Sequence, residues 1–243
     1  MALRKFLLVA IAAGTLPAAV IFSDGDFTTG WTDTMVVNQN LASFTYLPSN
    51  PVSGGNTGAF RQENHTMVQN SSASLAAGVW MVLYSAATYN PSAQGAIMTV
   101  DFSYDLLRIA GGNTGYGLGI VQNGRNYRAY FGDLPGASWA PFSHSALTSS
   151  TFIEMLDSGP YPHLDVNSHP DFTLAGSNIQ FGYLVLNSIS GSINHTTGID
   201  NWQVTLNNVP IATPEPSGFV LAGSALLAIA GLRIRKPKRS NLR

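Results

Sequence analysis

The sequence predicts an all-β protein, in which a single β-sandwich spans residues 24–212 between two terminal targeting segments. Three observations support this fold class. Short runs of aromatic and β-branched residues recur along the body and are separated by Gly, Pro, Asn and Ser clusters, which is typical of strands joined by turns. No stretch of the body has the periodicity of an amphipathic helix. The 243 residues, of which 45% are hydrophobic, suffice for one large domain.

Residues 1–23 are predicted to be a secretory signal helix. Arg4 and Lys5 supply the positive start, and residues 6–13 supply the apolar core that such signals need. A short membrane anchor or a buried helix is the alternative interpretation. Small residues allow cleavage at three places, which follow Ala13, Ala19 and Ser23.

The strands of the body are predicted from local composition. Aromatic and branched residues indicate strands at residues 80–85, 97–104, 116–122, 125–131, 179–186 and 202–209. Asn123-Gly124 accepts the positive φ angles of a type I′ turn, so residues 116–131 are predicted to form a β-hairpin. Trp80 lies in an apolar run and Trp202 in an alternating one, so we expect both in the core.

The charge of the body differs from that of the whole chain. Residues 24–212 contain four arginines, no lysine and twelve acidic residues, which gives a net charge of about −8. Such a surface argues against nucleic acid and anionic lipid as partners. Because the chain has no cysteine, no disulfide stabilises the fold and no thiol serves as nucleophile or ligand.

Residues 213–243 form a three-part segment at the end of the chain. A Pro-Glu-Pro tripeptide stiffens its start, and residues 217–232 follow without any charge. At a rise of about 1.5 Å per residue, these 16 residues reach about 24 Å as a transmembrane helix, enough for a thin bilayer. The basic tail from Arg233 to Arg243 is expected to stay on the cytoplasmic side.

This order of parts resembles the PEP-CTERM sorting signal of exported proteins in Gram-negative bacteria that make exopolysaccharide. Pro214, Glu215 and Pro216 match the signature tripeptide. The resemblance implies an inner-membrane intermediate that an exosortase, a membrane enzyme similar to cysteine transpeptidases, recognises and processes. It also implies release to the cell envelope or the extracellular matrix.

The two ends of the body carry a second resemblance. Residues 22–27, Phe-Ser-Asp-Gly-Asp-Phe, precede Gly30-Trp31 and look like the opening strand of jelly-roll carbohydrate-binding modules; residues 198–204 look like their closing strand. The resemblance implies that these strands lie side by side and that a structural Ca²⁺ binds to Asp24, Asp26 and Asp200. Alternatively, the first two acids cap a turn and the third bonds to backbone. The middle of the body also resembles laminin-G and legume-lectin sandwiches, so jelly-roll and concanavalin-like architectures both stay open.

Sugar recognition is predicted from aromatic and arginine side chains in the middle of the body. Sugar rings stack on aromatic faces, while polar side chains bind their hydroxyls. The candidates for sugar binding are Tyr116, Arg125, Tyr127, Arg128 and Trp139. Ordinary packing is the alternative interpretation for each of them.

Catalysis is a weaker hypothesis than binding. Glycoside hydrolysis needs two carboxyl groups that face each other across a sugar bond, and the body has two glutamates, Glu63 and Glu154. The closely spaced acidic cluster of sandwich glucanases is absent. We therefore expect an exported, non-catalytic adhesive or structural protein that binds carbohydrate, such as exopolysaccharide. A glycan-active hydrolase or lyase is the alternative, and a matrix component without a defined ligand is a third hypothesis.

Overall fold

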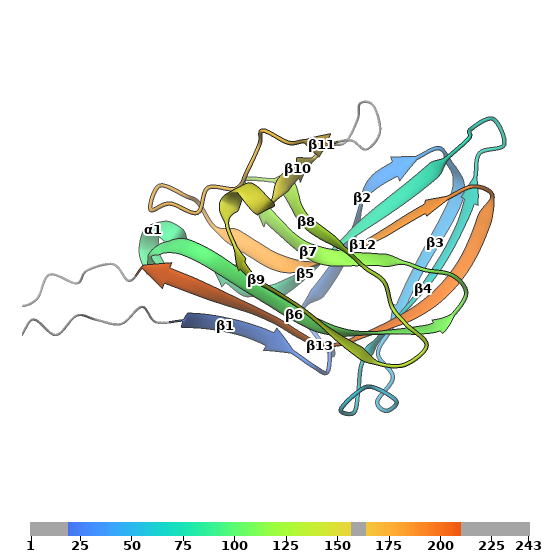
Figure 1. Ribbon diagram of the computed structural model, residues 1–243, viewed down its shortest axis with the longest axis horizontal. Helices are drawn as coiled ribbons and strands as arrows, with labels where there is room; N and C mark the ends of the chain where they lie inside the picture. Colours follow the sequence, from blue (N-terminus) through green and yellow to red (C-terminus); the bar gives the residue numbers. More distant parts are fainter. Residues whose placement is uncertain (1–18, 157–163, 210–243) are drawn as a thin grey trace, which may run out of the picture. The chain divides into compact units, whose positions relative to one another are not determined.

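Two antiparallel sheets face each other in the computed structural model, which describes residues 19–156 and 164–209 (Figure 1). Helix in this part of the chain is limited to α1 (Pro91–Gln94) and a 3₁₀ turn at Ser149–Thr151. The predicted all-β, two-sheet architecture is therefore confirmed for the described residues.

The first sheet, called the β13 sheet, has the order β3-β4-β13-β6-β9, and β1 pairs with β13 as well. Its strands are β1 (Ala19–Asp24), β3 (Leu41–Ser49), β4 (Arg61–Gln69), β6 (Ala96–Ala110), β9 (Ala140–Leu147) and β13 (Ser192–Val209). The second, the β12 sheet, has the order β11-β10-β8-β7-β12-β5-β2. Its strands are β2 (Trp31–Gln39), β5 (Ala76–Tyr89), β7 (Gly115–Gln122), β8 (Arg125–Asp133), β10 (Ile153–Met155), β11 (Leu164–Asp165) and β12 (Ile179–Ile189).

Strand β13 organises its sheet because its 18 residues pair with three other strands. It lies beside β6 along most of its length, beside β4 over its first half, and beside β1 over residues 202–207. The expected neighbourhood of the first and last strands is confirmed by the pairing of Asp24 with Trp202 (Figure 1). Residues 19–23, which the sequence places in the signal, therefore belong to β1 in this structure.

The core lies between the two sheets. Trp80 of β5 and Trp202 of β13 are both buried there, as the sequence predicts. Trp31 is partly covered and stacks on Tyr84 with ring centroids 4.9 Å apart. The predicted hairpin is confirmed as β7 and β8, with positive φ angles of 53° and 75° at its two turn residues, Asn123 and Gly124.

Several predicted features lie outside the described residues. They are residues 1–18 of the signal helix, the sorting motif Pro214, Glu215 and Pro216, and the transmembrane helix with its basic tail. Among the residues that the structure does describe, no helix has the length and hydropathy needed to cross a membrane.

Candidate functional site

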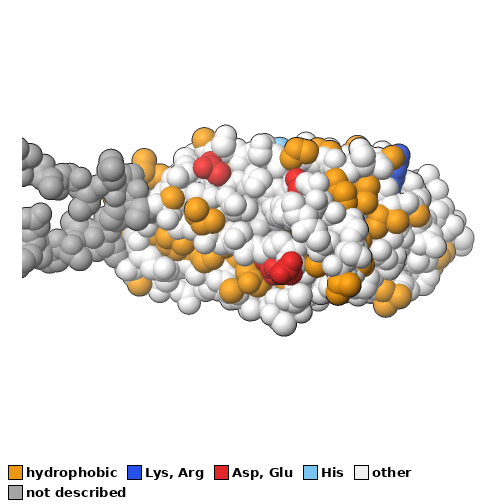
Figure 2. All heavy atoms as spheres, turned by 90° about the horizontal axis from the view of Figure 1, so that it is seen from below, with side chains coloured by type: hydrophobic (Ala, Val, Ile, Leu, Met, Phe, Trp, Pro, Cys, Tyr) orange, Lys and Arg blue, Asp and Glu red, His pale blue; other side chains and the backbone are white. Residues whose placement is uncertain are grey.

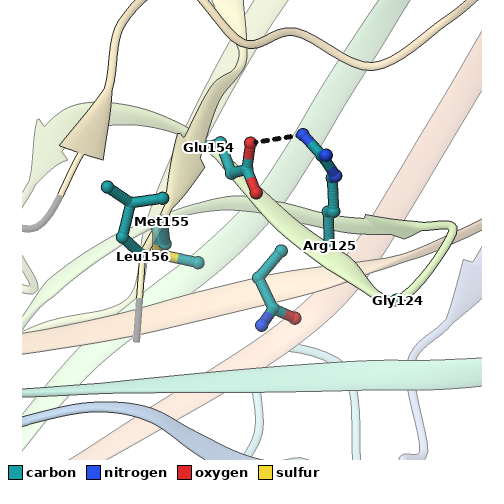
Figure 3. Close-up of a pocket in the computed structure, with 6 residues that line it drawn as sticks. Gly124, Arg125, Glu154, Met155 and Leu156 are labelled. Atoms are coloured by element: carbon teal, nitrogen blue, oxygen red, sulfur yellow. Dashed lines mark hydrogen bonds and ion pairs between the residues drawn. The ribbon is translucent and has the colours of Figure 1, made fainter. Parts of the chain in front are cut away.

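A pocket of about 260 Å³ opens between the β7–β8 hairpin and β10 (Figure 3). The described residues that line it are Gly124, Arg125, Asn126, Glu154, Met155 and Leu156. The Asn-Gly turn determines its position, because β8 begins with Arg125 directly after this turn. Strand β10 pairs with β8, with Glu154 opposite Tyr127. This pairing brings the Glu154 carboxylate into the pocket beside Arg125.

An ion pair crosses this pocket. Arg125 Nη1 lies 3.0 Å from Glu154 Oε2, and Figure 3 shows the two side chains pointing toward one another. The Arg125 side chain is 58% exposed, whereas that of Glu154 is 12% exposed. A guanidinium has five N–H donors and a carboxylate about four acceptor positions, so both groups retain hydrogen-bonding capacity for a ligand. The pocket therefore offers donors and acceptors side by side.

A contact between an arginine and a tyrosine side chain lies on the face of β8 that points away from the core. Tyr127 and Ala129 are buried in the core, so the alternating residues Arg128 and Tyr130 lie on the other face. The guanidinium carbon of Arg128 is 5.6 Å from the centre of the Tyr130 ring, a cation–π arrangement. Tyr130 keeps an exposed aromatic surface on this strand.

The structure places the five predicted sugar-binding residues in three different surroundings. Arg125 lines the pocket, and Arg128 lies further along β8. Tyr116 and Tyr127 are buried in the core, so their rings are covered by other side chains. Trp139 precedes β9, is partly exposed, and donates from Nε1 to the carbonyl oxygen of Gly54 at 3.0 Å.

The carboxylate of Asp24 accepts hydrogen bonds within its own turn. Its Oδ1 accepts from the backbone N–H groups of Asp26 and Phe27, each at 3.0 Å, and its Oδ2 accepts from Trp31 Nε1 at 2.8 Å. The side chain of Asp26 is exposed, and no contact of its own carboxylate contributes to this turn. Asp24 therefore forms the capped turn of the alternative interpretation.

Asp200 likewise accepts from backbone donors. Its Oδ2 accepts from the N–H groups of Asn56 at 2.7 Å and Thr57 at 3.3 Å, and its Oδ1 accepts from that of Asn201 at 2.7 Å. Within residues 19–156 and 164–209, no group of three or more His, Cys, Asp or Glu is placed to hold a metal ion. Ca²⁺ takes about six to eight oxygen ligands, and these can include backbone carbonyls and waters as well as carboxylates. Calcium binding by Asp24, Asp26 and Asp200 stays a prediction.

The interior contains a polar cluster around Glu63 that sequence reasoning did not find. Its fully buried carboxylate accepts hydrogen bonds from three tyrosine hydroxyls, those of Tyr46 at 2.7 Å, Tyr116 at 2.7 Å and Tyr183 at 2.5 Å. Tyr46 and Glu63 belong to the β13 sheet, whereas the other two tyrosines belong to the β12 sheet. The carboxylate thus joins the two layers of the sandwich.

Neighbouring polar and charged groups stabilise the ionised form of Glu63. Arg61 Nε lies 3.7 Å from Glu63 Oε1, and the same guanidinium contacts Asp33; His65 Nε2 lies 3.6 Å from Glu63 Oε2. Burial acts to raise the pKa of Glu63, but His65, Arg61 and the Tyr183 hydroxyl outweigh it and lower that pKa to about 2. Burial raises the pKa of Asp33, and Arg61 opposes this shift. Residues 61–65 alternate Arg-x-Glu-x-His, a period-two pattern that could have shown that the three groups share a strand face.

Glu63 and Glu154, the two glutamates of the body, lie in different sites. Glu63 is enclosed by tyrosines in the interior, whereas Glu154 lines the open pocket beside Arg125. Among the described residues that line this pocket, Glu154 is the one carboxylate. The pair of facing carboxyls that glycoside hydrolysis uses is therefore not formed by these two residues.

Comparison with known proteins adds distant structural neighbours. No protein-family model and no curated protein matches this chain. An exo-β-agarase has a TM-score of 0.38 at 14% identity, over 82% of this chain and 26% of its own. A carbohydrate-binding module described for specific mannan recognition has a TM-score of 0.34 at 12% identity, over 79% of this chain and 97% of its own. An endo-1,4-β-D-xylanase of Clostridium thermocellum, complexed with xylohexaose, has a TM-score of 0.30 at 13% identity, over 75% of this chain and 30% of its own. This chain thus spans about a quarter of the agarase's length.

Proposed function

We propose that the sandwich is a non-catalytic glycan-binding domain whose sugar site is the pocket at Arg125 and Glu154. The ion pair between the exposed Arg125 and the partly buried Glu154 is the observation that supports this function best. A sugar hydroxyl both donates and accepts, so a neighbouring guanidinium and carboxylate can bind two adjacent hydroxyls. The pocket volume of about 260 Å³ is below the range of about 300–1,000 Å³ for drug-sized ligands, which suits a single sugar unit.

The preferred glycan in this proposal is neutral. The body carries a net charge of about −8, so it repels a polyanionic polysaccharide. The face in Figure 2 has a few isolated acidic side chains among uncharged and hydrophobic ones. Polar groups without strong charge suit contact with a neutral polymer. Arg128, Tyr130 and Trp139 are additional surface residues at which a longer glycan could bind.

A glycan array probed with the full chain in detergent tests this function. We expect binding to neutral oligosaccharides and a loss of affinity of about 10- to 100-fold for Arg125→Ala, because a charge-assisted hydrogen bond is removed. Arg108→Ala is the matched control, since Arg108 contacts Asn113 on another part of the sandwich. Binding that does not change in Arg125→Ala contradicts this site. Silence of the whole array favours the structural matrix component.

Export is the second part of the proposal and rests on the sequence. The N-terminal segment directs the chain to the inner membrane, and an exosortase acts at Pro214, Glu215 and Pro216 to release it to the envelope or matrix. Replacement of these three residues by alanine should leave uncut protein in the inner membrane. Immunoblots of membrane and medium fractions measure this, and normal release of the variant would rule out the sorting role.

The position of β1 favours a signal cleavage that precedes it. Phe22 stacks on Phe181 with ring centroids 6.0 Å apart, so β1 contributes to the core. Cleavage after Ala13 keeps the whole strand, whereas cleavage after Ser23 removes all but Asp24. N-terminal sequencing of the exported protein should therefore find residues 20–23, and their absence would contradict this cleavage point.

Calcium binding at Asp24, Asp26 and Asp200 is tested separately by calorimetric melting. When the free calcium concentration is about 100 times the dissociation constant, binding adds about 2.7 kcal/mol to the free energy of unfolding. The melting temperature should therefore be higher in calcium than in EDTA. Asp26→Asn should reduce this difference without affecting the hydrogen bonds of the Asp24 turn, which use the backbone of residue 26. Identical melts would argue against a bound ion.

A further inference from the structure

Three reactive groups meet in the interior at Thr114, Asn187 and His195. The Thr114 hydroxyl donates to Asn187 Oδ1 at 3.0 Å, and its oxygen lies 3.3 Å from His195 Nδ1. The exposed fractions of the three residues are 0%, 2% and 8%. A hydroxyl, a primary amide and an imidazole are thus in contact in a site nearly free of solvent.

The fold brings these groups together from both sheets. Gly115 of β7 pairs with Leu186 of β12, and Thr114 directly precedes β7 while Asn187 directly follows Leu186, so the two residues lie side by side at the end of this strand pair. His195 comes from β13 of the opposite sheet.

Backbone close to the ring restricts the position of His195. A Cβ atom added to Gly112 would lie 2.8 Å from His195 Nε2, and Gly111 has a φ of 79° that favours glycine. The two glycines therefore let the chain pass directly against the imidazole, which limits its movement.

The chemistry of each group matches a role in acyl transfer. Within the described residues, Asn187 Nδ2 has no hydrogen-bond partner although it is buried, so the amide nitrogen is not used by the fold. Burial, and then the nearby His65, lowers the pKa of His195, so its ring is neutral near neutral pH and can accept a proton. The hydroxyl proton has both Asn187 Oδ1 and His195 Nδ1 within reach.

We propose that Thr114 and Asn187 form an intramolecular ester cross-link, with His195 as the general base. Thr114 Oγ1 gives its proton to His195 and bonds to the amide carbon Cγ of Asn187. The Cγ–Nδ2 bond then breaks, and the nitrogen takes that proton from His195 and leaves as ammonia. One O–H and one C–N bond are exchanged for one C–O and one N–H bond, so neither an oxidant nor a second reagent is needed.

The environment favours this reaction over hydrolysis. Fixed neighbours react with a high effective concentration, and burial excludes the water that would compete with the hydroxyl. The bond joins residues 73 positions apart in a chain that has no cysteine. It would restrict the unfolded chain as a disulfide does, and it would not depend on redox conditions. This inference is independent of the proposed glycan site.

Intact mass spectrometry of the full chain under denaturing conditions tests the cross-link. The expected mass is that of the same chain minus one ammonia, and digestion should yield joined peptides that contain Thr114 and Asn187. Hydroxylamine, which cleaves esters, should separate them. A chain of unchanged mass overturns the proposal, whether or not any variant folds.

Controls exclude other sources of the same mass loss. Asn123-Gly124 could lose ammonia by forming a cyclic imide, so a loss that maps there instead of to Asn187 contradicts the ester. Thr114→Ala and Asn187→Ala should keep the full mass, whereas Thr114→Ser keeps a hydroxyl and should still react. His195→Gln should slow the reaction by about 100-fold, the typical contribution of a general base. An unchanged rate in this variant would remove His195 from the mechanism.

Discussion

The body places each of its two glutamates beside an arginine, but in opposite environments. Glu63 and Arg61 lie in the interior, where the Glu63 carboxylate also accepts hydrogen bonds from three tyrosine hydroxyls. Glu154 and Arg125 lie on the neighbouring strands β10 and β8, where the arginine is largely exposed. The same two residue types therefore stabilise the sandwich in one place and remain available to a ligand in the other. Burial decides the difference, because a desolvated charge needs every partner whereas a solvated one does not.

The largest expected effect is that of Glu63→Gln. This change should lower the free energy of unfolding by about 3–5 kcal/mol, because it removes the charge at the centre of a buried network and with it one of the two carboxylates that Arg61 contacts. The matched change Glu154→Gln should cost less than about 1 kcal/mol, as for exposed ion pairs. Urea denaturation of both variants measures the two values. Equal losses would show that the two pairs do not differ as their burial implies.

Acid should remove the contribution of Glu63 to the free energy of unfolding. The folded pKa of about 2 lies below the ordinary value of 4.5, so the stabilisation is complete above that value and is lost as pH falls toward 2. The free energy of unfolding should fall by about 3 kcal/mol as Glu63 becomes protonated. The raised pKa of Asp33 acts in the opposite direction, because its charged form is penalised in the folded state. Denaturation from pH 6 to pH 2 measures the slope, and Glu63→Gln should be less sensitive to acid than the wild type.

The smallest expected effect is the coupling between Arg125 and Glu154. A double-mutant cycle with Arg125→Ala and Glu154→Ala should give about 0.2–1 kcal/mol, and salt should reduce it because the arginine is solvated. Melting in low and high salt measures the coupling. A value above about 2 kcal/mol would indicate a structural role for this pair and would weaken its assignment to a ligand.

Local signals in the sequence predicted much of the β12 sheet and the last strands of the chain. The Asn-Gly turn identified the β7–β8 hairpin because its two positive φ angles are a property of those two residues. Runs of aromatic and branched residues located parts of β5, β6, β12 and β13. Strand β4 was not predicted, because polar residues such as those around Glu63 interrupt the apolar pattern there, and its neighbour β3 was not predicted either.

Residue roles were less predictable than strands. Tyr116 was expected to contact sugar, yet its hydroxyl donates a hydrogen bond to the buried Glu63, which lies 53 positions earlier in the chain. Tyr183 reaches the same carboxylate from 120 positions away. A hairpin pattern identifies two alternating faces, but whether a face meets water or the other sheet depends on partners that are distant in sequence.

The sequence by itself determined the all-β class, the central hairpin and the acidic, cysteine-free body, and the targeting segments at both ends stay predictions. These follow from composition and from interactions between residues a few positions apart. Only the tertiary structure decided that Ala19–Asp24 is a strand, that Glu63 is enclosed, and that Arg125 and Glu154 share an open pocket. It alone brought Thr114, Asn187 and His195 together. The physical reason is that burial and reactivity depend on contacts across two sheets, and strand pairing between distant segments creates those contacts.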